Sequence, residues 1–330
     1  MTRPRTARAD RPLPAPDPAA LPSPATATAT GGPADRLAEA VARVRLVPDR
    51  YREFRQDGRQ AAREHGIGPD LIEELGEAGL PSQIRYGVDY FDRVDLANIA
   101  LALRLPNART LAMRGWAKSL RTASGAAAGT FEVEVRAHCP QPGHPGECEY
   151  TRSEALRFLD GYTPAAVPTL GQLRHRATAT ESTGRLPEAV AGLLRPLHFQ
   201  LLPEPLRADL GFLAETGLAD CDLAALYLTR EAGRLGLAAR YGFGFFLAAP
   251  YSIIHAWTEV LDGGEWHAFD PHLLNLLGDW SLLDPKEWPS HRSIGSCTAR
   301  VSNHHLWLTT HHGACAPLSL ATHWAEADAS

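Results

Sequence analysis

The sequence predicts an α+β fold in which a helix packs on an antiparallel sheet, with a mainly helical region before them. Three observations support this prediction. Apolar side chains recur at helical spacing through residues 35–120, a capped helix is expected to begin at Cys221, and three strand-like runs follow within residues 237–270. The helix and these strands form the expected core of the second half of the chain.

Composition and charge narrow the function classes before any motif is considered. The 330 residues are 44% hydrophobic and 22% charged, which is ordinary globular composition with enough apolar side chains for a sizeable core. The net charge of −5 creates no long-range field for nucleic acid. The longest apolar run, residues 243–250, is far shorter than the ~20 residues of a membrane span. We therefore expect partners that are neither nucleic acid nor membrane.

The cysteine count and the N-terminal segment indicate the compartment. Five cysteines, an odd number, do not form the pattern of a disulfide framework. Residues 1–32 include basic side chains but lack the apolar segment of a secretory signal. The protein is therefore expected to be soluble and cytoplasmic, in a reducing environment. Basic residues other than Lys118 and Lys286 are all arginine, and alanine is abundant, which indicates a GC-rich and hence bacterial genome.

Composition and periodicity divide the chain into four parts. Proline, alanine and threonine dominate the first part, which has no aromatic residue and is expected to be disordered. Helical periodicity marks the second part, strands and loops separated by proline and glycine connect it to the rest, and the fourth part is the predicted core. The four parts are residues 1–34, 35–122, 123–200 and 201–330.

Several helices are expected in the second part of the chain. Asp70 is positioned to cap a helix over residues 71–80. Two further helices are expected over residues 92–105 and 110–120, where apolar side chains recur at helical spacing. A group of neighbouring aromatic residues is interpreted as core or as a helix-packing surface. These residues are Tyr86, Tyr90 and Phe91.

The connecting part contains a predicted strand and a loop rich in metal-binding residue types. Residues 131–137 alternate apolar and charged side chains, which predicts a half-buried strand. The loop after it combines histidines and cysteines with prolines and glycines, and zinc is one interpretation. The cysteines lack the usual paired spacing, however, and adjacent His and Cys ligands do not suit tetrahedral geometry, so a hairpin turn with free thiols is preferred. The residues concerned are His138, Cys139, His144 and Cys148.

Cys221 has the sequence setting of a reactive cysteine. Asp220 is a suitable N-cap for a helix that begins at Cys221, because its carboxylate accepts a hydrogen bond from an exposed backbone N–H. A cysteine in the first turn lies at the positive end of the helix dipole, which favours the nucleophilic thiolate. The negative charge of Asp222 opposes this effect. On its own, such a cysteine is more often a packing residue.

A predicted hairpin brings a histidine and an aspartate together. Strands are expected over residues 237–247, 253–261 and 265–270, with Gly263 and Gly264 forming the turn between the last two. In this register Leu261 pairs with Trp266, Glu259 with Ala268 and Trp257 with Asp270. His255 and Asp270 then share one face as diagonal neighbours ~7 Å apart at the backbone, within reach of a hydrogen bond. Pro271 is expected to end the strand directly after the acid, at the rim of the sheet.

These residues together indicate thiol catalysis. His255 would accept the proton of Cys221, and Asp270 would orient the imidazole ring and stabilise its protonated form. The backbone N–H of Cys221 would donate to an oxyanion, with Trp257 as the candidate second donor. Taken singly, His255 is equally compatible with a core histidine, and Asp270 with a turn after a strand. Their order of nucleophile, base and orienting acid favours catalysis.

A second group of histidines and cysteines lies near the end of the chain. If this segment is one strand, His305 and His311 share a face but lie ~13 Å apart, too far to bind one ion. We therefore prefer a strand with histidines at its ends over a metal site. The members of this group are Cys297, His304, His305, His311, His312 and Cys315.

The central stretch resembles the transglutaminase-like superfamily. Members of that superfamily carry a cysteine at the start of a helix, an R-x-x-G-x-x-A-R element, a strand with H-A-W-x-E-V and a strand that ends in D-P. This chain has Cys221, the similar but shifted segment 234–240, the H-A-W-T-E-V run 255–260, and Asp270 followed by proline. The resemblance covers roughly residues 205–275. One departure is Ala219, where members usually have glycine two residues before the cysteine.

The resemblance implies a papain-like core and a cysteine-dependent enzyme with the triad Cys221, His255 and Asp270, without a cofactor or a bound metal. The expected reaction is acyl transfer through a thioester, either amide hydrolysis or amide formation in metabolite or peptide biosynthesis. The expected donor is a peptide, a protein or a carrier-bound acyl group, and the acceptor is an amine or water. The alternatives are a peptidase or amidase acting on a peptide, and a binding module without catalysis.

Overall fold

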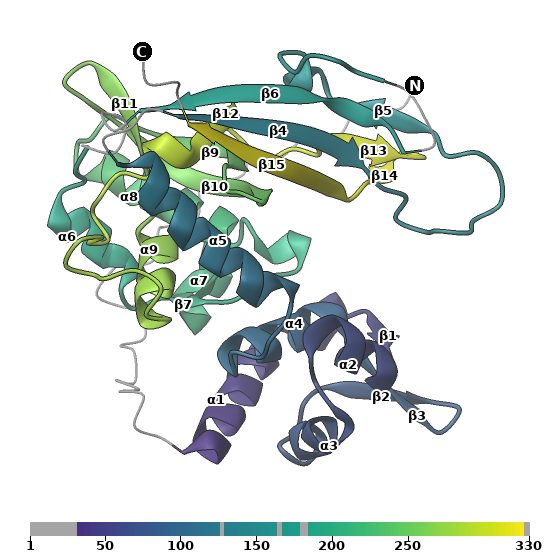
Figure 1. Ribbon diagram of the computed structural model, residues 1–330. Coiled ribbons are helices and arrows are strands. Elements are labelled where there is room, and N and C mark those ends of the chain that lie inside the picture. The colour runs from purple at the N-terminus through teal and green to yellow at the C-terminus, as the bar shows by residue number, and fades with distance from the viewer. Residues whose placement is uncertain (1–31, 126–128, 164–166, 179–183, 327–330) are drawn as a thin grey trace, which may run out of the picture.

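The computed structural model describes residues 32–125, 129–163, 167–178 and 184–326 (Figure 1). Nearly all of the predicted disordered arm, residues 1–34, lies outside the described residues. Its last residues belong instead to the first helix, which begins at Pro33 after the N-cap Gly32. Proline suits this first helical position because its missing N–H would have no partner there.

The N-terminal region is helical, as predicted, but it also contains a small sheet. Asp92 caps α4 through hydrogen bonds from two backbone N–H groups, and Asn107 caps α5. Three short strands in the order β1-β3-β2 were not predicted. The elements are α1 (Pro33–Arg45), α2 (Gly58–His65), α3 (Pro69–Glu77), α4 (Arg93–Ala102), α5 (Ala108–Ala123), β1 (Phe54–Gln56), β2 (Ser82–Arg85) and β3 (Val88–Asp92).

Two local predictions in this region were wrong. Asp70 does not cap a helix, because α3 begins one residue earlier, at Pro69, with Gly68 as its N-cap. Tyr86 is fully exposed and has a positive φ of 53° in the turn between β2 and β3, so it belongs to neither a core nor a helix-packing surface. Phe91 at the end of β3 is buried, in agreement with the core interpretation.

A seven-stranded antiparallel sheet dominates the rest of the chain, which makes the protein a mixed α and β fold. Six strands follow the order β12-β9-β10-β15-β4-β6, and β11 pairs with β10 outside this path. The predicted strand at residues 131–137 is confirmed as β4, whose side chains alternate between buried and more exposed. The strands are β4 (Gly129–Ala137), β6 (Thr169–Ala177), β9 (Ala239–Phe246), β10 (Tyr251–Asp262), β11 (Glu265–Phe269), β12 (Thr298–Ser302) and β15 (Leu318–Glu326).

This sheet joins segments from both sides of residue 201. The C-terminal strand β15 pairs with β4 over nine residue pairs, from Leu318 opposite Ala137 to Glu326 opposite Gly129. β4 then pairs with β6. The predicted connecting part, residues 123–200, therefore supplies strands to the same sheet as the predicted core.

Helices and two small sheets complete the fold. α8 packs against β10 and β9, and the parallel pair of β7 and β8 lies before it in the chain. Within the described ranges, no helix is long and apolar enough to cross a membrane. These elements are β5 (Tyr150–Arg152), α6 (Glu188–Ala191), β7 (His198–Phe199), α7 (Leu210–Thr216), β8 (Leu218–Ala219), α8 (Cys221–Arg234), α9 (Pro271–Asp279), β13 (Thr309–His311) and β14 (Ala314–Cys315).

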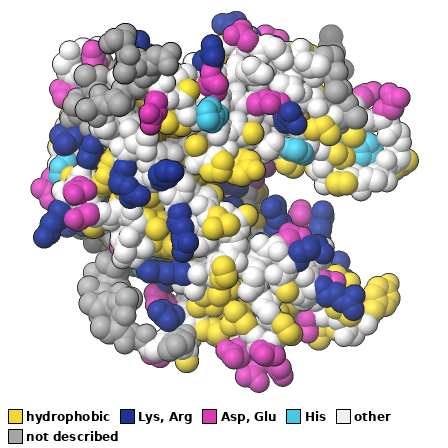
Figure 2. All heavy atoms as spheres, viewed as in Figure 1, with side chains coloured by type: hydrophobic (Ala, Val, Ile, Leu, Met, Phe, Trp, Pro, Cys, Tyr) yellow, Lys and Arg dark blue, Asp and Glu magenta, His cyan; other side chains and the backbone are white. Residues whose placement is uncertain are grey.

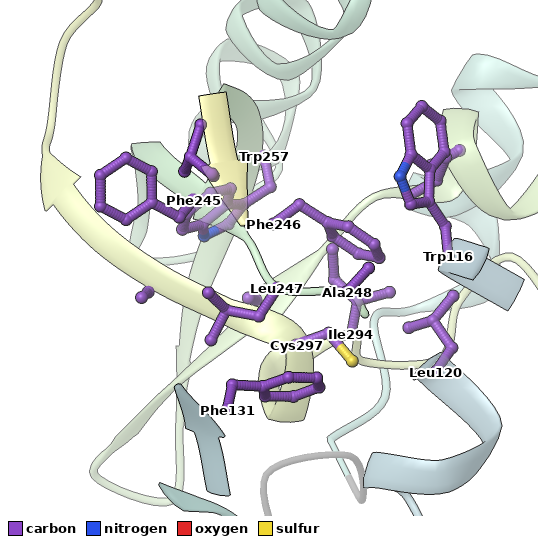
Figure 3. Close-up of a cluster of buried hydrophobic side chains, with 14 of the residues drawn as sticks. Trp116, Leu120, Phe131, Phe245, Phe246, Leu247, Ala248, Trp257, Ile294 and Cys297 are labelled. Carbon is purple, nitrogen blue, oxygen red and sulfur yellow. The ribbon is translucent and has the colours of Figure 1, made fainter. Parts of the chain in front are cut away.

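The largest cluster of buried side chains joins α5 to the sheet (Figure 3). Trp116 lies on α5, Phe131 on β4, Phe246 on β9 and Trp257 on β10, and all are at most 7% exposed. Full burial of such a side chain stabilises a fold by ~1.5–3 kcal/mol. α5, the last helix of the N-terminal region, therefore shares its core with β10, the strand that carries His255.

Candidate active site

Cys221 is the first residue of α8, as the sequence predicts. The carboxylate of Asp220 caps the helix by accepting a hydrogen bond from the backbone N–H of Leu223 at 3.0 Å. The helix is attached to β10 by Thr258, whose hydroxyl donates to the Ala225 carbonyl at 3.0 Å and lies 3.1 Å from the Thr229 hydroxyl. These contacts hold the start of α8 against the strand that carries His255.

The predicted hydrogen bond between His255 and Asp270 is present. Nε2–H of His255 donates to Oδ2 of Asp270 at 2.6 Å, and both side chains are buried. This bond leaves Nδ1 of His255 as the proton-accepting nitrogen. The Leu261–Trp266 and Glu259–Ala268 pairs occur as predicted.

The position of Asp270 differs in one respect from the prediction. The ladder between β10 and β11 ends at the pair Thr258–Phe269, so the expected pair of Trp257 with Asp270 does not form. Asp270 is instead the N-cap of α9, where its Oδ1 accepts a hydrogen bond from Leu273 N–H at 2.9 Å. Pro271 begins this helix at a position that tolerates proline. The carboxylate is therefore fixed by a helix start as well as by the histidine.

The sulfur of Cys221 lies beside the strand that carries the histidine. The backbone N–H of Ala256, the residue after His255, lies close enough to the Cys221 sulfur to act on the pKa of the thiol. In the described structure Cys221 and His255 are not hydrogen-bonded to each other. Catalytic hydrogen bonds often tighten only when substrate binds, so this geometry is compatible with a nucleophile and base.

The surroundings of Cys221 raise its pKa well above the ordinary thiol range. Burial is the main cause, and the negative charges of Asp222, Asp220 and Asp270 add to it, while the N–H of Ala256 acts in the opposite direction. The expectation that the helix start favours the thiolate is therefore wrong for the net effect in this structure. Burial of the thiol, together with the carboxylates at and beside the helix start, outweighs the dipole of α8.

Asp222 is held in the charged form by its neighbours. Burial alone would raise its pKa, but hydrogen bonds from His305 and Tyr241, together with the charges of His305 and Arg207, lower it. The Tyr241 hydroxyl donates to Asp222 Oδ1 at 2.6 Å, and Nδ1 of His305 lies 3.0 Å from the same oxygen. In return, the hydrogen bond to Asp222 raises the pKa of His305. Asp222 thus keeps a negative charge next to the cysteine.

Arginines from distant segments also lie near Cys221. Burial lowers the pKa of the Arg109 guanidinium, the nearby Cys221 sulfur raises it, and the charges of Arg93 and Arg207 lower it further. Arg207 Nε is 3.2 Å from Asp220 Oδ2. Arg109 is the second residue of α5, which begins where the N-terminal helices meet the rest of the molecule. Figure 2 shows a deep hollow between these two parts of the surface.

Trp257 makes contacts that do not favour its predicted oxyanion role. The side chain is 1% exposed, and its indole N–H donates to Glu259 Oε1 at 3.2 Å. Glu259 also accepts from Arg240, its ladder partner on β9, and lies 3.4 Å from Arg300. Arg240 and Glu259 of the motif therefore form a partly exposed network with Trp257 and Arg300. The backbone N–H of Cys221 stays a candidate oxyanion donor.

His272 was not identified from the sequence. It is 3% exposed, and its Nε2–H donates to the carbonyl of Ala219 at 3.1 Å. This bond joins α9, which Asp270 caps, to the segment just before Cys221. Arg109, Arg207 and His305 were likewise not assigned to the site, because only tertiary contacts bring them near Cys221 and its neighbour Asp222.

One cluster of possible metal ligands lies outside this site. Cys139, His144, Cys148 and His311 offer ligand atoms that all lie within 4.8 Å of one another. His138 does not join them, because its Nε2 is 2.7 Å from the Ser319 hydroxyl. His305 bonds to Asp222 and is not in the same strand as His311, so the prediction of one strand with both histidines was wrong.

The geometry thus combines a helix-start thiol, an imidazole and a carboxylate at adjacent elements. No family model, curated protein or solved structure matches this chain in comparisons with known proteins. The function is therefore argued from the site itself.

Proposed function

We propose that this protein is an enzyme with a transglutaminase-like core that transfers acyl groups through a thioester on Cys221. The observation that carries the proposal is the buried hydrogen bond between His255 and Asp270, which is 2.6 Å long. His255 lies on β10, and the backbone N–H of the next residue, Ala256, is close enough to Cys221 to lower the pKa of its thiol. A histidine oriented by a carboxylate beside a helix-start cysteine is the arrangement that activates thiol nucleophiles.

The proposed reaction has two steps. His255 Nδ1 takes the proton from Cys221, and the sulfur attacks the carbonyl carbon of the donor. The bond from that carbon to the leaving group breaks, and the protonated His255 returns the proton to the leaving group. Water or an amine then attacks the thioester, His255 transfers a proton from it, and the free thiol is restored. Asp270 stabilises the protonated imidazole in both steps.

The charges around the site favour a particular class of donor. Arg109 lies close enough to Cys221 for their charges to interact, Arg207 lies 3.2 Å from Asp220, and both guanidinium groups carry fixed positive charge. We propose a donor with an anionic group near its acyl carbon, within a peptide, a protein or a carrier-bound acyl chain. The acceptor is an amine or water, and the protein acts in the reducing cytoplasm, where Cys221 stays a thiol.

A non-catalytic binding module is the second candidate, because one observation favours it. Burial and three carboxylates raise the pKa of Cys221, so little thiolate exists near neutral pH unless His255 accepts the proton. The two candidates therefore differ in whether the reactivity of Cys221 depends on His255.

Site-resolved alkylation separates these candidates. Peptide mass spectrometry after brief iodoacetamide treatment near neutral pH reports the labelling of each of the five cysteines. In a catalytic site, His255→Ala should slow labelling of Cys221 by at least about tenfold, because the general base is lost. His267→Ala, which removes a histidine on β11 outside the triad, should leave the rate unchanged. Slow labelling of Cys221 that is indifferent to His255 would exclude the enzyme.

Intact-mass spectrometry then tests the acyl intermediate. Incubation with thioester or amide donors, with and without a carboxylate near the acyl group, should add the acyl mass to the wild-type protein and to Cys315→Ser. The adduct should be absent from Cys221→Ala. An adduct that persists in Cys221→Ala contradicts the proposal, and release of amide or free acid distinguishes the two acceptors.

A further inference from the structure

We propose that Cys139, His144, Cys148 and His311 form a structural zinc site. All four ligand atoms lie within 4.8 Å of one another. In a tetrahedral site with Zn–S near 2.3 Å and Zn–N near 2.0–2.1 Å, the ligand atoms are roughly 3.4–3.8 Å apart. The cluster is therefore close to the size that one zinc ion requires, and it is independent of the proposed acyl transfer.

The backbone explains how residues far apart in sequence meet. His311 on β13 pairs with Tyr150 on β5, two residues after Cys148, so the ladder fixes His311 next to the end of the loop. Gly143 and Gly146 have φ values of 89° and 88°, which let the loop turn back on either side of His144. The loop supplies three of the four ligands, and His311 on β13 supplies the fourth.

His144 has the hydrogen bonds of a metal ligand. Its Nδ1–H donates to the carbonyl of Pro145 at 2.9 Å, which fixes the tautomer and leaves Nε2 with a free electron pair. Histidines that bind metals usually donate their second N–H to a carbonyl or carboxylate in this way. Nε2 lies 3.4 Å from Cys148 Sγ, close to the edge length of a tetrahedral zinc site.

His311 supplies the independent observation that points to a ligand. The residue is 4% exposed, and within the described structure its buried Nε2 has no hydrogen-bond partner. A buried polar atom without a partner is costly, and a bound metal ion removes that cost. Its ring centroid lies 4.9 Å from that of His144, so both imidazoles face the same small space.

The remaining ligand, Cys139, has its own supporting contact. The backbone N–H of Gln141 donates to its sulfur at 3.4 Å, and such bonds stabilise a metal-bound thiolate. Neither cysteine of the site forms a disulfide. On binding, both thiols lose their protons to solvent and the two histidines bind as neutral imidazoles, so the occupied site has no net charge. Two thiolates and two imidazoles in a closed tetrahedron select zinc over calcium or magnesium.

Elemental analysis of the purified full-length protein tests the proposal. Wild-type protein prepared under reducing conditions should contain about one zinc ion per chain. The variants Cys148→Ser and His311→Ala should lose most of it. The matched controls Cys315→Ser and His312→Ala should keep it, because these neighbouring residues lie outside the cluster.

Measurements on the wild-type protein test the zinc site even if the variants fail to fold. Titration with an organomercurial should release zinc in proportion to the two thiolates modified, and cobalt reconstitution should give the absorption of a tetrahedral thiolate complex. Zinc-free protein that shows no cobalt absorption after reduction overturns the proposal. So does full zinc content in His311→Ala, since a site without His311 lacks its fourth ligand.

Discussion

At the residue scale, the reactivity of Cys221 depends on the carboxylate next to it. Asp222 keeps its charge through hydrogen bonds from His305 and Tyr241, and that charge helps to raise the pKa of the thiol. The rate of alkylation at Cys221 should therefore still rise with pH above neutrality, because more thiolate forms as the pH approaches the raised pKa.

Asp222→Asn should shift this pH profile towards lower pH. Removing a negative charge makes the thiolate less costly, so the pKa of Cys221 falls. A fall of about one unit gives roughly tenfold faster labelling at neutral pH. Site-resolved iodoacetamide rates across a pH series measure the effect. Asp262→Asn, in the exposed hairpin turn, is the control and should leave the profile in place. A profile that shifts to higher pH in Asp222→Asn would contradict the proposed effect of the Asp222 charge on Cys221.

The three predicted triad residues could be identified from sequence because their geometry is local. A tight glycine turn sets the register of β10 and β11, and Asp220 caps the helix that begins at Cys221. The sequence gives no comparable signal for Arg109 or for the bond between Asp222 and His305. These residues meet only through tertiary packing, because Asp222 and His305 are 83 positions apart and Arg109 and Cys221 are 112 positions apart (221 − 109).

At the element scale, one buried glutamate holds the strands behind the site together. Glu259 on β10 accepts hydrogen bonds from Arg240 on β9 and from Trp257, and lies close to Arg300 on β12. The guanidinium of Arg240 also lies over the Trp266 ring of β11, 3.9 Å from the ring centroid. Loss of this carboxylate leaves the buried indole N–H of Trp257 without its acceptor and removes the ion pair with the partly exposed Arg240.

Glu259→Ala should therefore lower the free energy of unfolding by about 1–3 kcal/mol, the cost typical of leaving a buried donor unpaired, because the Arg240 and Arg300 side chains are 32% and 38% exposed and can be solvated. Urea denaturation followed by tryptophan fluorescence measures the change. Glu265→Ala, at the exposed end of β11, is the matched control and should change the free energy by less than about 0.5 kcal/mol. Equal stability of the two variants would show that the network does not stabilise the sheet.

The strands of the site were easier to predict than those at the other end of the sheet. β9, β10 and β11 are close in sequence, and the segments before β9 and β11 contain glycines with positive φ, which gives these strands a local signal. β6 carries two arginines and a histidine, and it becomes a strand because β4 provides a partner. The pairing of β4 with β15 joins the middle of the chain to its end, and no local pattern specifies such a contact.

At the scale of the whole molecule, the N-terminal region contributes to the site as well as to the fold. Its helix α5 packs into the core through Trp116 and Leu120, and Arg109 in the first turn of this helix lies close enough to Cys221 for their charges to interact. The helical region was predicted, but Arg109 was not singled out, because a single arginine among many has no distinguishing pattern. The hollow in Figure 2 lies between this region and the sheet.

The charge that Arg109 brings to the site is measurable without knowing the substrate. Iodoacetate and iodoacetamide react with the same thiolate but differ in charge, so the ratio of their rates at Cys221 reports the local potential. Removing Arg109 raises the pKa of Cys221 and slows both reagents equally, whereas lost attraction slows only the anion. Arg109→Ala should therefore lower the ratio of iodoacetate to iodoacetamide rates by roughly three- to tenfold, the effect of one nearby charge. Arg114→Ala, an exposed arginine of the same helix, should leave the ratio unchanged. An equal ratio in wild type and Arg109→Ala would show that Arg109 does not attract an anionic donor. It would not affect the proposed role of His255.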